Sequence, residues 1–323
     1  MVMTSGKAVY FFCSDETKDP VAGHVLREAL KLYNFDETDI IIDKFPMFKH
    51  TDKNGNLFCY VQTSEVLSHN YPKYLPILNY HFADFDIAGI VNWHGGQNAP
   101  DGILTVHTTG DVETGFFSPV KPLYMRNLLL SLKQNCEKLS IRDFIVTCEA
   151  THWSGIPHNG NASMIPLFQV PIIDIEIGSS PIRWADQGAA RVIASALSNV
   201  FTGDSNKLLN LLCIGGIHFE PAFANVLFQN WDGYAFAISH ILAGRWLIAG
   251  KYDTEEGLVK LETCLKSIQD TVDGIIFHDS LKSGYKEQCR ILAKKYDIPI
   301  FKHQLLRKPI DIFKALSKKR QTV

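Results

Sequence analysis

Histidines, glutamates and glycines follow apolar runs at five places along this sequence. The segments are residues 92–96, 104–111, 148–153, 176–180 and 215–219. Parallel strands deliver such side chains into loops at one edge of a sheet, where α/β proteins place their binding and catalytic groups. Several imidazoles together with carboxylates are the ligands that zinc takes in catalytic sites. The pattern therefore predicts one polar site that contains a metal ion.

The candidate metal ligands and bases in these segments are His94, His107, His152, His218, Glu149 and Glu176. A bound zinc ion lowers the pKa of its water to about 7 and so supplies hydroxide for attack on a carbonyl group. Gly215 and Gly216 allow the close backbone approach that a substrate or an oxyanion needs. For any one of these histidines, the alternative to metal binding is a partly buried loop residue whose ring is satisfied by hydrogen bonds and has no functional role.

Glu176 lies between two isoleucines, and its carboxylate requires a partner if the strand is buried on both faces. On an exposed strand the same residue would be unremarkable. Five further histidines lie outside such patterns and are treated as background: His24, His81, His158, His278 and His303.

Composition indicates a globular protein. The 323 residues are 46% hydrophobic and 20% charged, which excludes disorder over most of the chain. The net charge of -2 gives no general attraction to nucleic acid, so RNA contact would require a local basic patch. Lys314 with residues 318–320 is one candidate, and a solvated helix end is the alternative.

Cysteine usage and the lack of targeting segments predict an intracellular, cytoplasmic protein without a membrane anchor. Seven cysteines without a C-x-x-C pair argue against a disulfide framework and a structural zinc knuckle. The N-terminus does not have the pattern of a signal peptide, and uncharged runs are too short to span a bilayer.

Strand and helix patterns alternate along the chain. Strands are predicted at residues 8–13, 40–42, 57–62, 87–92, 144–149, 172–177, 208–214, 234–238, 274–278 and 299–302. Helices are predicted at 123–139, 185–200, 255–269 and 283–296, with one more after Asp19-Pro20. This alternation predicts a three-layer α/β/α fold with a mostly parallel central sheet, phosphorylase- or hydrolase-like in kind. We expect a single domain over residues 1–323, with loop insertions near 45–56 and 154–171, the second of which could form a flap.

The polar segments also form an ordered set of motifs. After His94 come Leu104-Thr105-Val106-His107 with Gly110-Asp111, Glu149-Ala150-Thr151-His152, Glu176-Ile177-Gly178-Ser179, and Gly215-Gly216-Ile217-His218-Phe219-Glu220-Pro221. In this order and over most of the chain, the set resembles the archaeal and plant type of D-aminoacyl-tRNA deacylase, a metal-dependent family. Each motif alone is weak, whereas the ordered set is fairly specific.

The resemblance implies a hydrolase that cleaves the ester between a D-amino acid and the terminal ribose of tRNA. It assigns zinc to His107, His152, Glu176 and His218. It implies that Glu149 orients or deprotonates the attacking water and that Gly215 and Gly216 face the oxyanion. His94 and Asp111 are candidate contacts to the substrate amine.

The sequence departs from the family pattern at three places. Trp153 stands where the family has a second histidine, Ile217 breaks a glycine triplet, and Asp111 replaces an asparagine. Trp153 could stack against an adenine or an aromatic group of the substrate, or it could pack against the segment 154–171. Two alternative functions follow: transfer or release of an aminoacyl or peptidyl group from another carrier in a small-molecule pathway, and binding without catalysis.

Overall fold

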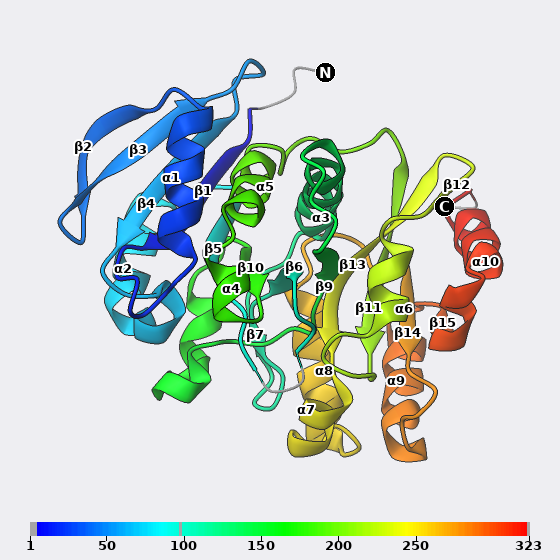
Figure 1. The fold of residues 1–323 in the computed structure, drawn as a ribbon. Helices are drawn as coiled ribbons and strands as arrows, with labels where there is room; N and C mark the ends of the chain where they lie inside the picture. The colour runs from blue at the N-terminus through cyan, green and yellow to red at the C-terminus, as the bar shows by residue number, and fades with distance from the viewer. Residues whose placement is uncertain (1–4, 97–98, 322–323) are drawn as a thin grey trace. The chain divides into compact units, whose positions relative to one another are not determined.

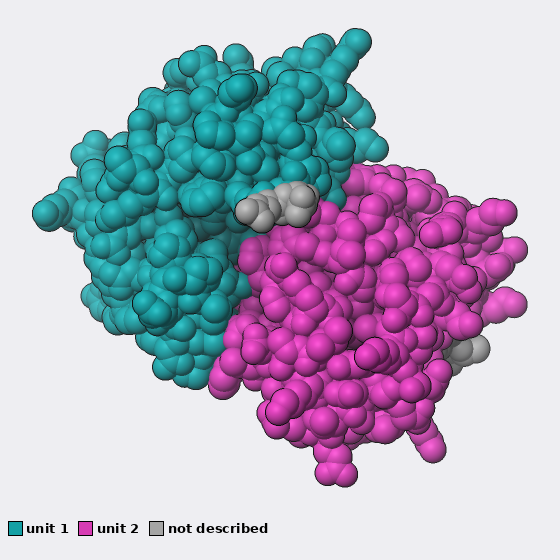
Figure 2. All heavy atoms as spheres, turned by 60° about the horizontal axis from the view of Figure 1, so that its bottom comes forward, with its two compact units in different colours: residues 1–107, 127–147, 153–203 teal, residues 108–126, 148–152, 204–323 magenta. Residues whose placement is uncertain are grey.

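The computed structural model describes residues 5–96 and 99–321, and contacts within the chain divide it into two compact units. Unit 1 comprises residues 1–107, 127–147 and 153–203, and unit 2 comprises 108–126, 148–152 and 204–323 (Figure 2). Three elements contain residues of both units: β6 (Ile103–Thr108), α3 (Pro122–Lys138) and β9 (Ile145–Cys148). The single domain expected from the sequence stays a prediction.

Unit 1 is built on a mixed sheet of strand order β2-β3-β4-β1-β5-β10-β6-β9 (Figure 1). Besides β6 and β9, its strands are β1 (Lys7–Cys13), β2 (Asp36–Ile42), β3 (Phe45–Thr51), β4 (Leu57–Thr63), β5 (Ile87–Trp93) and β10 (Ile172–Gly178). β1 pairs in parallel with β4 and β5, and β5 pairs in parallel with β10. These parallel strands end at the same edge of the sheet, which is where their polar residues follow.

The helices of unit 1 include two that the sequence patterns did not predict, α2 and the short α4. The helices are α1 (Ala22–Leu32), α2 (Tyr71–His81), α4 (Pro181–Trp184) and α5 (Gln187–Leu197), with 3-10 turns η1 (Leu67–Asn70), η2 (Ile156–His158) and η3 (Ala162–Leu167). α1 packs against α5, and both contact the sheet. The helix predicted after Asp19-Pro20 begins at Ala22, with Val21 at its N-cap, so the notion that Asp19 is the N-cap residue is wrong. Asp19 still supports this end of the helix, because its Oδ1 accepts the Val21 and Ala22 amide protons at 2.8 and 2.9 Å.

The two predicted insertions are ordered within unit 1. Residues 45–51 form β3, which pairs antiparallel with β2 and β4, so the hairpin alternative holds there and the polar residues 52–56 form its turn. The segment 154–171 contains η2 and η3. A role for it as a flap stays a prediction.

Unit 2 is built on a second sheet of strand order β12-β13-β11-β14-β15. Its strands are β11 (Lys207–Ile214), β12 (Asn230–Trp231), β13 (Tyr234–Leu242), β14 (Gly274–Phe277) and β15 (Ile300–Lys302), and β7 (Gly110–Asp111) pairs with β8 (Phe116–Phe117) in a small hairpin. β11 pairs in parallel with both β13 and β14, and β14 with β15. The helices are α6 (Pro221–Val226), α7 (Gly244–Ala249), α8 (Glu255–Ser267), α9 (Ser283–Lys295) and α10 (Ile310–Gln321), with the 3-10 turn η4 (His303–Arg307).

Helices cover both faces of the sheet in unit 2. Leu261 of α8 and Leu292 of α9 share a buried cluster with Ile214 and Phe277 of the strands. Phe313 of α10 packs on the other side, with its ring centroid 5.1 Å from that of Tyr234. α10 also carries Lys314 of the predicted basic patch, whereas the side chains of Lys319 and Arg320 lie outside the described residues.

The predicted α/β class and the mostly parallel strand pairing are confirmed. All ten predicted strands and the five predicted helices are present, with ends that differ by a few residues. Among the described residues, none of the helices has the length and apolar character needed to cross a membrane. All seven cysteines are buried free thiols.

Candidate active site

Two carboxylates and an imidazole cluster inside unit 1. Asp174 and Glu176 lie two residues apart on β10 and so share one face of the strand, and both are almost fully buried. The His107 Nε2 atom, near the end of β6, is 3.4 Å from Glu176 Oε1 and 4.0 Å from Asp174 Oδ2. Asn92 of β5 donates an amide proton to Asp174 Oδ1 at 2.8 Å. Carboxylates removed from water require a nearby positive charge, which an imidazolium or a metal cation supplies.

His94 lies directly after β5 in unit 1, and its backbone and ring are both fixed there. Its N–H donates to the Ile177 carbonyl at 3.0 Å, and its own carbonyl accepts the Trp184 indole proton at 2.9 Å. The His94 Nδ1 atom is 3.1 Å from Ser179 Oγ. Ser179, in the motif that begins at Glu176, therefore orients the His94 imidazole.

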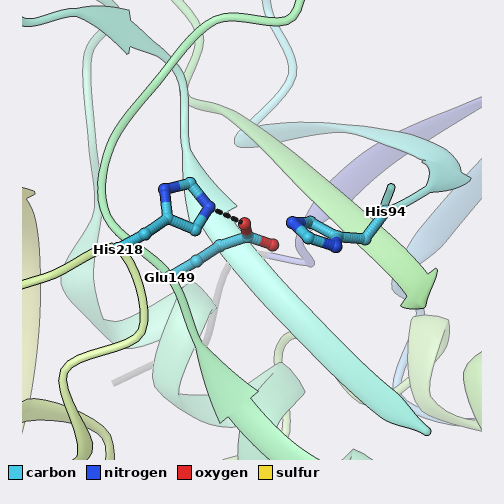
Figure 3. Close-up of side chains that lie close together, drawn as sticks. All are labelled: His94, Glu149 and His218. Carbon is cyan, nitrogen blue, oxygen red and sulfur yellow. Dashed lines mark hydrogen bonds and ion pairs between the residues drawn. The ribbon is translucent and has the colours of Figure 1, made fainter. Parts of the chain in front are cut away.

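Glu149 and His218 meet inside unit 2. The His218 Nε2 atom is 2.6 Å from Glu149 Oε2, as the dashed line in Figure 3 shows. The backbone supports the pair, since the Ala150 N–H donates to the His218 carbonyl at 2.9 Å. Glu149 is almost fully buried. A histidine that donates one ring proton to a carboxylate presents its other ring nitrogen, here Nδ1, to a ligand.

His152 lies beside this pair in unit 2. Its Nδ1 is 2.9 Å from the Ala150 carbonyl oxygen. Because a carbonyl oxygen accepts hydrogen bonds and cannot donate them, Nδ1 carries the ring proton, and Nε2 is the potential ligand atom. The ring centroids of His152 and His218 are 5.0 Å apart. Trp246 of α7 packs on both rings, at 5.8 Å from His152 and 5.5 Å from His218.

A third histidine of unit 2 contacts the threonines next to these groups. His240, on β13, is completely buried, and its Nδ1 is 3.0 Å from Thr108 Oγ1 and 3.2 Å from Thr151 Oγ1. Its Nε2 is 3.0 Å from Ser267 Oγ. Burial lowers the pKa of His240 to about 3, because the charged imidazolium would lose its hydration. The ring is therefore neutral near pH 7, and it bonds to Thr108, which follows His107, and to Thr151, which precedes His152.

The glycine turn after β11 has a conformation that favours glycine. Gly215 and Gly216 have φ values of +97° and +81°, in the left-handed region. The Gly215 N–H donates to the Leu242 carbonyl at 2.7 Å, and the Gly216 carbonyl accepts the Gly244 amide proton at 3.0 Å. An oxyanion contact from Gly215 would require that bond to open, so Gly216 is the better donor candidate.

The two predicted substrate contacts have local partners. Asp111 lies in the β7–β8 hairpin of unit 2, where its carboxylate accepts the Thr114 hydroxyl proton. Trp153 is only 3% exposed and packs edge-to-face on Tyr71 in unit 1, with ring centroids 5.8 Å apart. A Cβ atom on Gly155 would lie 2.5 Å from the indole. This packing agrees with the alternative in which Trp153 supports the segment 154–171, and the substrate contacts stay predictions.

Sequence reasoning missed three residues beside these groups. Asp174 was detectable, because it alternates with Glu176 on one face of an otherwise apolar strand. His240 lies outside the five polar segments, and its burial gave no signal in the sequence. Trp246 belongs to none of the motifs.

Comparison with known proteins supports the resemblance. The family model described as D-aminoacyl-tRNA deacylase matches residues 81–301. A D-aminoacyl-tRNA deacylase of Cenarchaeum symbiosum is 24% identical over 196 residues, which cover 52% of this chain and 70% of that protein. One of Archaeoglobus fulgidus is 24% identical over 209 residues, which cover 60% and 69%.

The fold also has a solved counterpart. The crystal structure of a conserved protein of unknown function superposes with a TM-score of 0.72 and covers 94% of this chain and 97% of its own. The sequence identity in that superposition is 21%, so the likeness establishes the α/β fold alone.

Proposed function

Since the chain belongs to the D-aminoacyl-tRNA deacylase family, an enzyme family of ester hydrolases, we propose that it hydrolyses D-aminoacyl-tRNA with the help of a zinc ion. The match over residues 81–301 includes every residue assigned to the site. The observation that carries the proposal is chemical: buried carboxylates and imidazoles cluster in the matched segments of both units.

The donor groups in each unit fit a zinc ion. In unit 1, Glu176 and His107 present an oxygen and a nitrogen 3.4 Å apart, close to the ~3.3 Å that separates two ligands of a tetrahedral zinc ion. In unit 2, the imidazoles of His152 and His218 supply nitrogen donors, and their ring centroids are 5.0 Å apart. Zinc in hydrolytic sites is commonly bound by histidine nitrogens and a glutamate oxygen, the ligand types present here.

Two of the proposed ligands are next in sequence to a pair of threonines in unit 2, and the binding of one ion by all four residues stays a proposal. His107 is joined by a peptide bond to Thr108, whose Oγ1 is 2.7 Å from Thr151 Oγ1. Thr151 in turn precedes His152 in the chain, and His152 forms a parallel bridge with Thr109. Thus His107 and His152 are each one residue from the same threonine contact.

The residues of this chain have distinct roles in the proposed hydrolysis. A bound zinc ion supplies a water of lowered pKa and polarises the ester carbonyl. Glu149 orients His218 through their 2.6 Å bond, and we assign it as the base that accepts a proton from the attacking water. The Gly216 amide is assigned to the oxyanion, a contact worth about 3 kcal/mol in other enzymes. His94 and Asp111 are assigned to the substrate amine.

The test compares D-tyrosyl-tRNA with L-tyrosyl-tRNA as substrates of the full-length protein. We expect release of D-tyrosine, little release of L-tyrosine, and loss of activity with a chelator that zinc restores. Zinc content is measured on the same preparation by elemental analysis. Equal hydrolysis of both substrates, or of neither, by protein of verified zinc content would refute the proposal.

A matched pair of variants separates the metal from the substrate specificity. His152→Ala removes a proposed ligand, whereas His81→Ala removes a background histidine of unit 1. We expect only the first to lose zinc and activity together. Activity without zinc would retain the deacylase and reject the metal. The acceptor end of the tRNA as the contact region and the cytoplasmic location both remain predictions.

A further inference from the structure

Three parallel strands of unit 2 end in a second group of potential metal ligands. β11, β14 and β15 are neighbours in the sheet, and Phe277 of β14 is in register with Lys302 of β15. A histidine follows directly after β14 and after β15: His278 after Phe277, and His303 after Lys302. Their ring centroids are 3.9 Å apart. Two residues treated as background in the sequence are therefore brought together by strand register alone.

Glu220 completes the group from the loop after β11. Its backbone precedes α6, and its Oε2 atom is 3.5 Å from the Nε2 atom of His278. Potential ligand atoms of Glu220, His278 and His303 all lie within 4.8 Å of one another. A Cβ atom on Gly216 would lie 3.0 Å from Glu220 Oε2, so a glycine there leaves room for the carboxylate.

The far side of each imidazole has its own hydrogen-bond partner. His303 Nδ1 is 2.7 Å from Asp279 Oδ2, which also accepts the Gln304 amide proton at 3.2 Å. His278 Nδ1 is 2.6 Å from Ser280 Oγ. Metal-binding histidines commonly donate the proton of their second ring nitrogen to a carboxylate or another oxygen, which directs the first nitrogen at the ion. His303 has that arrangement with a carboxylate. His278 Nδ1 instead accepts the Ser280 amide proton at 3.2 Å, so Ser280 holds this ring through both its amide and its hydroxyl group.

The burial of the group also suits a cation. His303 is 8% exposed, and the side chains of His278 and Glu220 are 18% and 11% exposed. A single dication at this depth would be held by both rings and the carboxylate, and a buried carboxylate is favoured by such a charge. Two nitrogens and one oxygen, with one coordination position left, form a common zinc ligand set.

We propose that Glu220, His278 and His303 bind a zinc ion in unit 2, at a site separate from the residues assigned to deacylation. The ligand atoms are Nε2 of each histidine and a carboxylate oxygen of Glu220. Asp279 and Ser280 position the rings. The ion connects the ends of β14 and β15 to the start of α6, so we expect it to stabilise this part of unit 2.

The test measures zinc binding to metal-free, full-length protein by competition with a chromophoric chelator. Glu220→Gln, His278→Ala and His303→Ala should each bind one zinc ion fewer than the wild type, or bind it more than about 100-fold more weakly. Outer partners of metal ligands typically contribute 10–100-fold, so Asp279→Asn should weaken the same site by about 10-fold. His81→Ala is the control and should bind zinc as the wild type does. Cobalt in place of zinc should give the absorption of a four-coordinate nitrogen and oxygen site.

The readout is independent of deacylation, so failure of one proposal leaves the other standing. Circular dichroism and thermal unfolding without metal show whether each variant is folded. Glu220→Gln preserves the size of the side chain and tests the site even if both histidine variants unfold. Unchanged zinc stoichiometry and affinity in folded Glu220→Gln would overturn the site and would indicate that Glu220 pairs with a protonated His278 instead.

Discussion

The buried His240 imidazole makes a specific prediction about acid stability. Its pKa is lowered from 6.5 to about 3 by burial. The folded protein therefore binds fewer protons at this residue than the unfolded chain does between these values. For such a group, stability is fully present above the unfolded pKa of 6.5 and is lost as the pH falls toward the folded value. The window in which stability declines is thus pH 6.5 to about 3.

The size of the effect follows from the two pKa values. Each unit of pKa difference corresponds to about 1.4 kcal/mol, and at a pH near 5 the unfolded chain is favoured by about 2 kcal/mol relative to neutral pH. Water does not screen this effect, because His240 is 0% exposed. We expect the wild type to lose about 2 kcal/mol of unfolding free energy between about pH 7.5 and pH 5 through this residue.

The assay is urea denaturation of wild type and His240→Gln at both pH values. Glutamine retains hydrogen-bonding groups for Thr108 and Ser267 but does not titrate, so the variant should lose about 2 kcal/mol less on acidification. His81→Gln serves as the control, because His81 is partly exposed at the end of α2. If wild type and His240→Gln lose stability equally on acidification, the burial argument fails.

The same variant also bears on zinc binding. Because Thr108 and Thr151 are next in sequence to His107 and His152, His240→Gln should lower zinc affinity about 10-fold.

Three substitutions give further tests. His107→Ala and His218→Ala should each lower kcat/KM for D-tyrosyl-tRNA by at least ~100-fold while circular dichroism stays unchanged, because each removes a proposed zinc ligand; wild-type turnover in both would reject the ligand assignment. Trp153→Ala should cost about 3–5 kcal/mol in urea denaturation and leave KM unchanged, since the indole is packed on Tyr71; a raised KM in a stable variant would instead support a substrate contact. Gly216→Ala should cost about 1–2 kcal/mol, because φ is +81° there, and an unchanged midpoint of urea unfolding would contradict that strain.

Local patterns in the sequence were sufficient for most of the elements. β10 could be predicted because five of its residues are isoleucine or glycine. The presence of α1 could be predicted after Asp19-Pro20, although the helix begins at Ala22. α2 was missed, since its two prolines and its aromatic residues obscure the helical spacing. The segment 45–51 was polar enough to be read as a loop or hairpin, and only its pairing with β2 and β4 made it a strand.

The sequence by itself determined which residue types could perform chemistry, and the ordered motifs determined the family. Only the tertiary structure decided which of them meet, because such contacts depend on strand order and register. Glu149 and His218 are 69 residues apart in the sequence, and Asp279 and His303 are 24 residues apart. A histidine in a motif and a histidine in a background segment look alike in sequence. His278 and His303 became a candidate site only because two neighbouring parallel strands end in register, a relation that spacing along the chain does not contain.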